Sequence, residues 1–289
     1  MVYFLDQLED GQDVAGLQRN LDAFSKLTRE AVVFLWDIST STQRASYAEH
    51  KNYPAVVTQL TRHVCEFLDG VSILAAQGAA EPCKPLLRSA IEAVLLINYV
   101  LESDSERRGL AYHVAHAHRK IKLYDKVEPA KQAPFATFVA GLKTMLASPE
   151  YAPIEAEWQA TKKGRGNWFS LFKGPQNVKE LADLAKRPEL YEWFYGYYSS
   201  AMHAGDGFDK IGRGNNGTGE KAIKPLRHPE TLQGMVITAV SLCSMVTTML
   251  LERWGTHEQK VKAQADYIAN IRPDLMVLRG DQLIHAPWL

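Results

Sequence analysis

The residues best able to do chemistry are four apart in the stretch YEWFYGYYSSAMH, residues 191–203. Tyr191, Tyr195, Ser199 and His203 would form one stripe of an α-helix, because positions four apart share a helix face. Their hydroxyl and imidazole groups need partners wherever they are buried, since unpaired buried polar groups are costly. The spacing therefore predicts a polar surface on another element that faces this stripe. Ser199 and His203 are also the types of a nucleophile and its base, although such a pair on one helix is seldom poised for attack.

A charged pair stands inside the most apolar helix of the chain, which we expect over residues 86–101. Arg88 and Glu92 are four apart, and leucine, isoleucine and valine surround them. A charged pair in such a setting must be paired and further hydrogen-bonded. We therefore expect Arg88 or Glu92 to bond to the stripe of residues 191–203. Two interpretations stay open: a buried structural network that fixes helix register, and a pocket that binds or processes an anionic or polar ligand.

The stretch KKGRGNWFSLFKGP, residues 162–175, mixes cations with aromatic residues. This combination suits a phosphate backbone and unstacked bases. The alternative is that the aromatic side chains fold into the core while the lysines stay solvated. The candidate substrate-binding residues are Lys163, Arg165, Trp168 and Lys173, together with Tyr191.

Three histidines close together, His113, His116 and His118, raise the question of a metal site. On a helix His113 and His116 share a face and His118 points away. No E-x-x-H sequence accompanies them, so the usual ligands of a di-iron site are missing. The segment GRGNNGTGEK has neither the preceding strand nor the G-K-[ST] ending of a P-loop. We expect no metal and no cofactor.

Composition bounds the class of protein. The chain has 33 Lys and Arg against 33 Asp and Glu, so net charge argues neither for nor against a polyanionic partner. Its three cysteines are far apart in the sequence, which disfavours a disulfide framework or zinc site and fits a reducing cytoplasm. We expect neither a signal peptide nor a transmembrane helix, and hence no membrane partner.

Apolar residues recur with helical spacing along most of the chain, and no stretch alternates as a strand does. We expect an all-α, multi-helix bundle of about nine or ten helices, with no sheet of three or more strands. Ser39–Ser46 predicts a polar linker, and the S-x-x-E of Ser103–Glu106 predicts a capping box. Asp206–His228 predicts a long loop that is mobile or reshaped by a ligand. The expected helices cover residues 13–37, 54–78, 86–101, 135–146, 154–162, 177–185, 188–203, 229–254 and 257–270, with one more after Ser103 and no clear period from Arg272.

A resemblance follows from the order and spacing of three motifs: R-S-x-x-E at residues 88–92, Trp168, and Y-x3-Y-x3-S-x3-H at residues 191–203. Together they resemble the bacterial family called domain of unknown function 5677, over residues 54–207. We divide a single domain, residues 1–289, into this family-like core, a polar loop at 208–228, and C-terminal helices and a tail at 229–289.

That family is helical, and it resembles in turn the small nucleic-acid-associated HEPN domains, many of which are ribonucleases of toxin and phage-defence systems. HEPN nucleases carry an R-x4-to-6-H motif, and Arg108 and His113 stand at that spacing. The resemblance implies an RNA-directed protein of bacterial stress or phage defence, either a metal-independent ribonuclease or an inactive relative. Its partners would be RNA and, as a homo-oligomer such as a dimer, a second copy of the chain.

Metal-free RNA cleavage needs a base for the 2′-hydroxyl and a cation for the phosphate. The candidate catalytic residues are Arg88, Glu92, Tyr195, Ser199 and His203, with Arg108 and His113 as a second candidate pair. The alternative is a non-catalytic binding module, in which the same pocket holds a small polar ligand or a protein partner.

Overall fold

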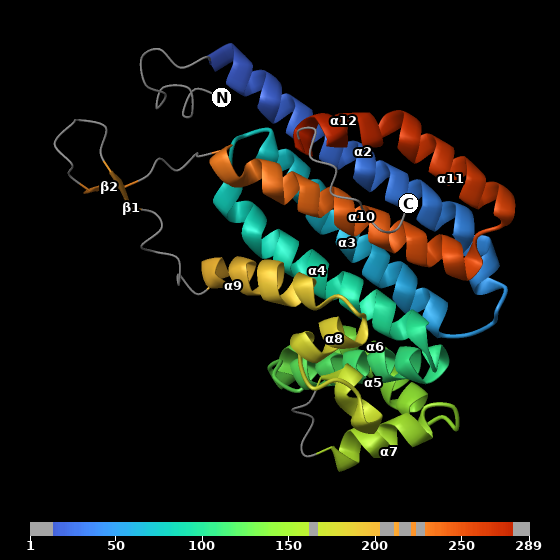
Figure 1. The fold of residues 1–289 in the computed structure, drawn as a ribbon. Helices are drawn as coiled ribbons and strands as arrows, with labels where there is room; N and C mark the ends of the chain where they lie inside the picture. Colours follow the sequence, from blue (N-terminus) through green and yellow to red (C-terminus); the bar gives the residue numbers. More distant parts are fainter. Residues whose placement is uncertain (1–13, 162–166, 203–210, 214–220, 224–228, 280–289) are drawn as a thin grey trace. The chain divides into compact units, whose positions relative to one another are not determined.

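Helices account for almost all of the described chain (Figure 1). They divide between two compact units. The computed structural model describes residues 14–161, 167–202, 211–213, 221–223 and 229–279. Unit 1 comprises the described parts of Met1–Ser46, Leu60–Val94 and Glu189–Leu289, and unit 2 comprises those of Tyr47–Gln59 and Leu95–Pro188. The sequence predicts one domain, whereas the chain leaves unit 1 and returns to it twice.

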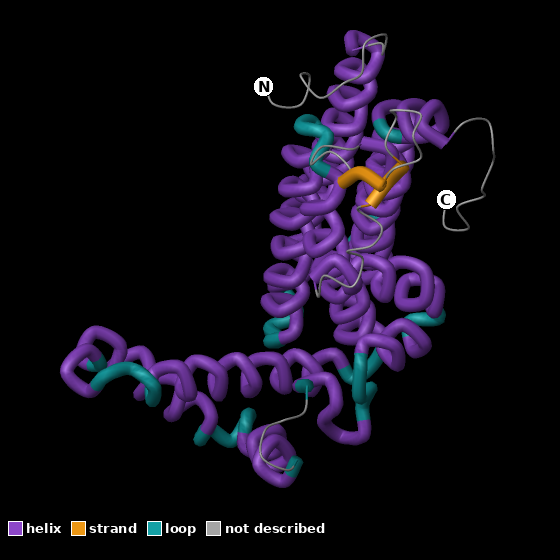
Figure 2. The backbone as a smooth tube through the Cα atoms, turned by 90° about the vertical axis from the view of Figure 1, so that its left-hand side faces the viewer, coloured by secondary structure: helices purple, strands orange, loops and turns teal. Residues whose placement is uncertain are grey.

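Long helices build unit 1. The helices α2 (Val14–Tyr47) and α10 (Leu232–Trp254) lie side by side with the unit 1 parts of α3 (Tyr53–Ala75) and α4 (Ala80–Glu102) (Figures 1 and 2). The C-terminal helices α11 (His257–Asn270) and α12 (Arg272–Arg279) follow α10. Leucine and isoleucine fill the core between them, each worth about 1.5–3 kcal/mol when fully buried. Fully buried examples are Leu35, Leu68, Leu87, Ile91 and Leu242.

Helix α10 combines high hydropathy with burial. Its apolar window has a mean hydropathy of 1.9, and its 23 residues are long enough to cross a membrane by length and composition alone. However, 61% of that window is buried inside the protein. A core helix of a soluble protein has the same character.

Helix α5 (Ser105–Tyr124) is the element of unit 2 on which α6 (Ala136–Leu146), α7 (Ala152–Ala160) and the short 3-10 segment η4 (Trp168–Lys173) pack. A hydrogen bond of 2.7 Å between His118 and Glu155 joins α5 to α7. The remaining elements are η1 (Pro129–Lys131), η2 (Ala133–Phe135) and α8 (Val178–Leu184). Asn177 caps α8 as its sequence predicts, by accepting a bond from the Glu180 amide.

The predicted linker at Ser39–Ser46 is wrong, because α2 continues through it to Tyr47. The polar side chains there are satisfied within the helix itself. Thr42 and Ser46 are each 2% exposed, and their hydroxyls donate to the Ile38 and Gln43 carbonyl oxygens at 2.9 and 2.8 Å. Hydroxyl residues that bond back to their own helix can therefore enter a core without ending the helix.

The predicted capping box at Ser103–Glu106 is also wrong. Asp104 is the N-cap of α5, with a left-handed φ of 48° and no side-chain cap bond. The Glu106 carboxylate instead accepts the backbone N–H groups of Asn52 and Tyr53 at 2.9 and 3.3 Å. Glu106 thus caps α3 rather than its own helix. Similarly, α4 begins at Ala80 and contains Pro85, although the sequence predicts that the helix follows this proline.

The all-α prediction is confirmed. The described residues form eleven α-helices, close to the nine or ten expected, and α12 adds a helix where the sequence shows no clear period. The one sheet among the described residues is an antiparallel pair, β1 (Ile211–Arg213) and β2 (Lys221–Ile223), within the stretch predicted as a long loop. The rest of Asp206–His228 lies outside the described residues, and so does the prediction of its mobility.

Candidate functional site

Arg88 of α4 bonds to the stripe that the sequence singles out. Its Nε–H donates to Ser199 Oγ at 2.9 Å, and its Nη2 donates to the Tyr195 hydroxyl. Its guanidinium carbon lies 4.5 Å from the centre of the Tyr195 ring, a cation–π contact. All of these residues belong to unit 1. The expected contact between the two segments is therefore present.

Glu92 completes what we call the Arg88 cluster, which consists of Arg88, Glu92, Tyr195 and Ser199. The Tyr195 hydroxyl donates to Glu92 Oε2 at 3.4 Å, and Arg88 Nη1 lies 3.8 Å from the same oxygen. The Ser199 hydroxyl donates to the Tyr195 carbonyl oxygen at 2.7 Å, which leaves its oxygen free to accept from Arg88. Two hydroxyls and a carboxylate thus orient one guanidinium.

The cluster is partly open to solvent. The Arg88 and Glu92 side chains are 25% and 36% exposed, so they do not form the buried network that one of the two interpretations requires. The reason is the helix face: Leu87 and Ile91, each one residue before a charged position, are fully buried, whereas Arg88 and Glu92 lie at the edge of the core. A solvent-accessible guanidinium can reach a ligand, which a sealed one cannot.

The segment that carries Tyr195 is not α-helical throughout. Leu190–Tyr195 (η5) is a π-helix, and the Gly196 N–H bonds to the Tyr191 carbonyl five residues back. The α-helical part, α9, covers Gly196–Met202. The Tyr191 and Tyr195 rings stack with their centres 5.5 Å apart and 20° between their planes. Short π segments inside helices are frequent at functional sites.

Burial favours the neutral, protonated form of the Tyr195 hydroxyl. Removal from water, with the Glu92 carboxylate as the next cause, raises the pKa of its hydroxyl to about 12, although Arg88 opposes the shift. Near neutral pH the phenol keeps its proton. Tyr195 can therefore donate a hydrogen bond or a proton, but it is not a general base.

Two residues that the sequence analysis missed extend the site. Lys84 lies four positions before Arg88, and its Nζ is 2.8 Å from Glu81 Oε1 and 4.9 Å from the centre of the Tyr197 ring. The same four-residue spacing that links Arg88 to Glu92 could have revealed it. His63 of α3 is close enough for the Glu92 carboxylate to favour its charged form, although burial lowers its pKa overall. No sequence signal indicates that proximity.

The family of unknown function DUF5677 matches residues 55–218, more than half of the chain. The chain belongs to this family. The match confirms the resemblance found over residues 54–207, and all four residues of the Arg88 cluster lie within it. No curated protein and no solved structure matched the chain.

Arg108 and His113, the second candidate pair of this DUF5677 protein, do not form a common site. Arg108 donates to the Tyr99 carbonyl oxygen and pairs with Glu102 at 3.2 Å, whereas His113 Nδ1 lies 3.0 Å from the Tyr151 hydroxyl. Positions five apart on an α-helix point about 140° away from each other. Burial also lowers the pKa of His113. Each residue therefore has its own structural partner in unit 2.

Most of the predicted RNA-contacting loop has another role or is not described. Trp168 is 8% exposed and packs against the rings of Tyr99 and Tyr112, at 5.7 and 5.3 Å between centres. It is a core residue, so its expected role in base stacking is wrong. Lys173 is exposed and lines a cavity of unit 2. Lys163, Arg165 and the proposed base His203 lie outside the described residues.

Proposed function

We propose that this DUF5677 protein is an RNA-directed, HEPN-like protein that binds RNA phosphate at the Arg88 cluster and cleaves RNA without a metal ion. The observation that carries the proposal is a partly exposed guanidinium held in place by Tyr195 and Ser199. Arginine is well suited to phosphate, because its planar fork can donate two parallel hydrogen bonds. Because the guanidinium is already oriented before a ligand binds, Arg88 loses less conformational entropy on binding than a flexible side chain would.

Cleavage of RNA requires two proton transfers, one from the attacking 2′-hydroxyl and one to the leaving 5′-oxygen. The 2′-oxygen of the ribose attacks phosphorus, and its proton passes to a base, for which His203 is the candidate by its position four residues after Ser199. The bond from phosphorus to the 5′-oxygen breaks, and that oxygen takes up a proton. Tyr195, which keeps its proton at neutral pH, is the candidate donor, and Arg88 stabilises the charge on phosphate.

Exposed aromatic side chains near the cluster in sequence support RNA as the substrate class. Trp193 and Tyr197 are 70% and 45% exposed, and both belong to the segment that carries Tyr195. Single-stranded RNA is recognised largely by bases that stack on such rings. A small inorganic anion has no base that could stack on these rings.

The test is incubation of the full chain with total RNA in the presence of a chelator. Arg88→Ala and His203→Ala should each lower the cleavage rate by about a hundredfold or more, as the loss of one electrostatic or acid–base group does. The matched control is Arg62→Ala, since Arg62 forms an equivalent pair with Glu66 at 2.8 Å on the surface of α3. Cleavage that survives in Arg88→Ala, or that disappears equally in Arg62→Ala, would refute the proposal.

A second candidate function is a binding module without turnover. Glu92 favours it, because a carboxylate beside the guanidinium repels phosphate and suits a ligand or protein partner that also carries donors. A wild-type protein that neither binds nor cleaves RNA would support this alternative and exclude the ribonuclease.

A further inference from the structure

Unit 2 contains a cavity of about 420 Å³, whereas the residues of the Arg88 cluster belong to unit 1. Its floor is buried, with Tyr99 4% exposed and the Arg108 side chain 12% exposed. Its rim carries Arg107, Phe172 and Lys173, as well as residues of α8. The volume is within the range of about 300–1,000 Å³ that small-molecule sites occupy.

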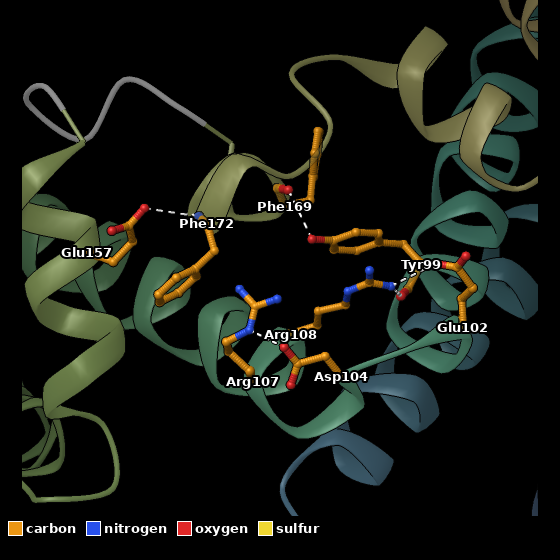
Figure 3. Close-up of polar contacts among 8 residues, drawn as sticks. All are labelled: Tyr99, Glu102, Asp104, Arg107, Arg108, Glu157, Phe169 and Phe172. Carbon is orange, nitrogen blue, oxygen red and sulfur yellow. Dashed lines mark hydrogen bonds and ion pairs between the residues drawn. The ribbon is translucent and has the colours of Figure 1, made fainter.

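Arg108 on the floor is only partly satisfied. Its Nη1 bonds to the Tyr99 carbonyl oxygen and to Glu102, and its guanidinium carbon lies 3.9 Å from the centre of the Tyr99 ring (Figure 3). Its Nε is buried, and no acceptor among the described residues reaches it. Because solvent does not reach this Nε, a ligand in the cavity would meet the positive charge of the Arg108 guanidinium rather than this donor.

The rim segment has an unusual backbone. Phe172 and Lys173 are consecutive left-handed residues, with φ of 54° and 60°, a conformation that costs a non-glycine residue about 1–2 kcal/mol. The Phe172 N–H donates to Glu157 Oε1 at 3.0 Å, and a Cβ on Gly174 would lie 2.0 Å from the Phe169 carbonyl oxygen. Strain that surrounding contacts hold in place is characteristic of binding sites.

Two cations line the rim, Arg107 from α5 and Lys173 from the strained segment. Arg107 pairs with Asp104 and stacks over the Phe172 ring, with 4.4 Å from its guanidinium carbon to the ring centre (Figure 3). Lys173 has no ion-pair partner among the described residues. The rim carboxylates are already engaged, because Asp183 pairs with Lys179 at 2.9 Å and Glu180 accepts the Gln176 N–H at 2.8 Å. Lys173 is therefore available to an anion.

We propose that this cavity binds a nucleoside monophosphate, with the phosphate between Lys173 and the two arginines. Phe172, Pro175 and Leu184 give it an apolar side that suits a flat base. Glu180 and Asp183 keep carboxylate lone pairs beyond their present bonds, and these can accept from ribose hydroxyls. A free phosphate would leave both of these sides unused. This inference does not depend on the proposed ribonuclease function.

The experiment is calorimetric titration of the full chain with adenosine 5′-monophosphate, adenosine and inorganic phosphate. We expect the monophosphate to bind at least about tenfold more tightly than adenosine, since one hydrogen bond to a charged group is worth that much. Lys173→Gln should weaken binding by about tenfold for the same reason. It removes an exposed charge, so the fold should survive.

Two control variants make the result specific. Lys131→Gln removes another exposed lysine of unit 2, 75% exposed, that does not line the cavity, and it should leave the affinity unchanged. Arg88→Gln should also leave it unchanged. Equal loss in Lys131→Gln, no loss in Lys173→Gln, or no binding by the wild-type protein would overturn the inference. Loss in Arg88→Gln would place the nucleotide at the Arg88 cluster, which would overturn this inference and leave the proposed function standing.

Discussion

Arg88 has five N–H donors, and the cluster around it accepts from only some of them. Its partners are two hydroxyls at hydrogen-bond distance and a carboxylate at 3.8 Å. The cluster therefore combines a fixed orientation with spare donors. This combination separates Arg88 from Arg108, whose guanidinium is largely buried under Tyr99.

Removal of Arg88 should cost stability as well as function. We expect Arg88→Ala to lower the free energy of unfolding by about 1–2 kcal/mol, because two hydroxyls lose a charged donor at a partly exposed site. Glu92→Ala should cost less, since Glu92 accepts one bond of 3.4 Å. Denaturant unfolding of each variant measures the difference.

Arg62→Ala is the control for this prediction. Its pair with Glu66 has side chains that are 67% and 57% exposed, and an exposed helical pair contributes only about 0.3–0.5 kcal/mol. If Arg88→Ala and Arg62→Ala unfold alike, the bonds of Arg88 to Tyr195 and Ser199 contribute nothing to the fold.

Tyr195 should lose its proton at a higher pH than an ordinary tyrosine does. Its pKa is raised to about 12 from an ordinary value of 10, so the folded state holds the proton more tightly than the unfolded state does. The resulting stability is complete below pH 10 and is lost as the pH rises through about 12. Ultraviolet titration of tyrosinate should show a component near pH 12 that becomes smaller in Tyr195→Phe, because Tyr198 still contributes to it.

Glu92→Gln tests whether the Glu92 carboxylate raises the pKa of Tyr195. The Glu92 carboxylate contributes to the raised pKa of Tyr195, so its neutralisation should lower that pKa. A higher pKa in Glu92→Gln would contradict the assignment. Tyr198, whose pKa burial also raises to about 12, should be unaffected and serves as the internal reference.

At the scale of the elements, sequence periodicity predicted most helices but not how they end. The range of α11 matches residues 257–270, because Thr256 and Gln259 form a true capping box there. The same motif at Ser103–Glu106 failed, because Glu106 makes its bonds to α3, from a distant part of the chain. The local sequence around Glu106 does not show that backbone N–H groups at the start of α3 compete for its carboxylate.

The candidate site shows the same limit. The four-residue spacing predicted that Arg88 and the stripe would meet, and hydrogen bonds to Tyr195 and Ser199 confirm it. It did not predict the π-helix, since a spacing of four does not distinguish the two helix types over six residues. It also overestimated the burial of Arg88, because apolar neighbours in sequence point to the other side of the helix.

Two helical glycines of unit 2 should respond to alanine in opposite ways. A Cβ on Gly109 of α5 would lie 2.7 Å from the Tyr53 Cα, so Gly109→Ala must displace backbone and should cost about 1–3 kcal/mol. A Cβ on Gly141 of α6 meets nothing within 4 Å. Gly141→Ala should therefore stabilise the protein by about 0.5–1 kcal/mol.

Thermal melts of the two variants test how closely α3 approaches α5. The substitution is identical and both sites are helical, so differences in helix propensity cancel. Equal shifts in the melting temperature would show that the close approach of Gly109 to Tyr53 is absent in solution.

For the whole molecule, the division into two units was beyond the sequence. Periodicity reports the buried face of each helix but not the helix that covers it. Unit 2 is assembled from Tyr47–Gln59 and Leu95–Pro188, and the break between these segments falls where no proline- or glycine-rich linker marks it. The two candidate sites belong to different units, so each can be altered separately.

The balance of charge over the whole chain makes a last prediction about RNA. With 33 cationic and 33 anionic residues, the protein has no general attraction for a polyanion, so binding must come from a few local contacts. Each phosphate contact with single-stranded RNA contributes about −0.7 to the slope of log affinity against log salt concentration. We expect a shallow slope of about −1 to −3 for the wild-type protein. Arg88→Gln should make it less negative by about 0.7, and Lys131→Gln should not change it. A steep slope, or one that Arg88→Gln leaves unchanged, would mean that RNA binds elsewhere, because the guanidinium at the Arg88 cluster would then displace no counterion from the phosphate.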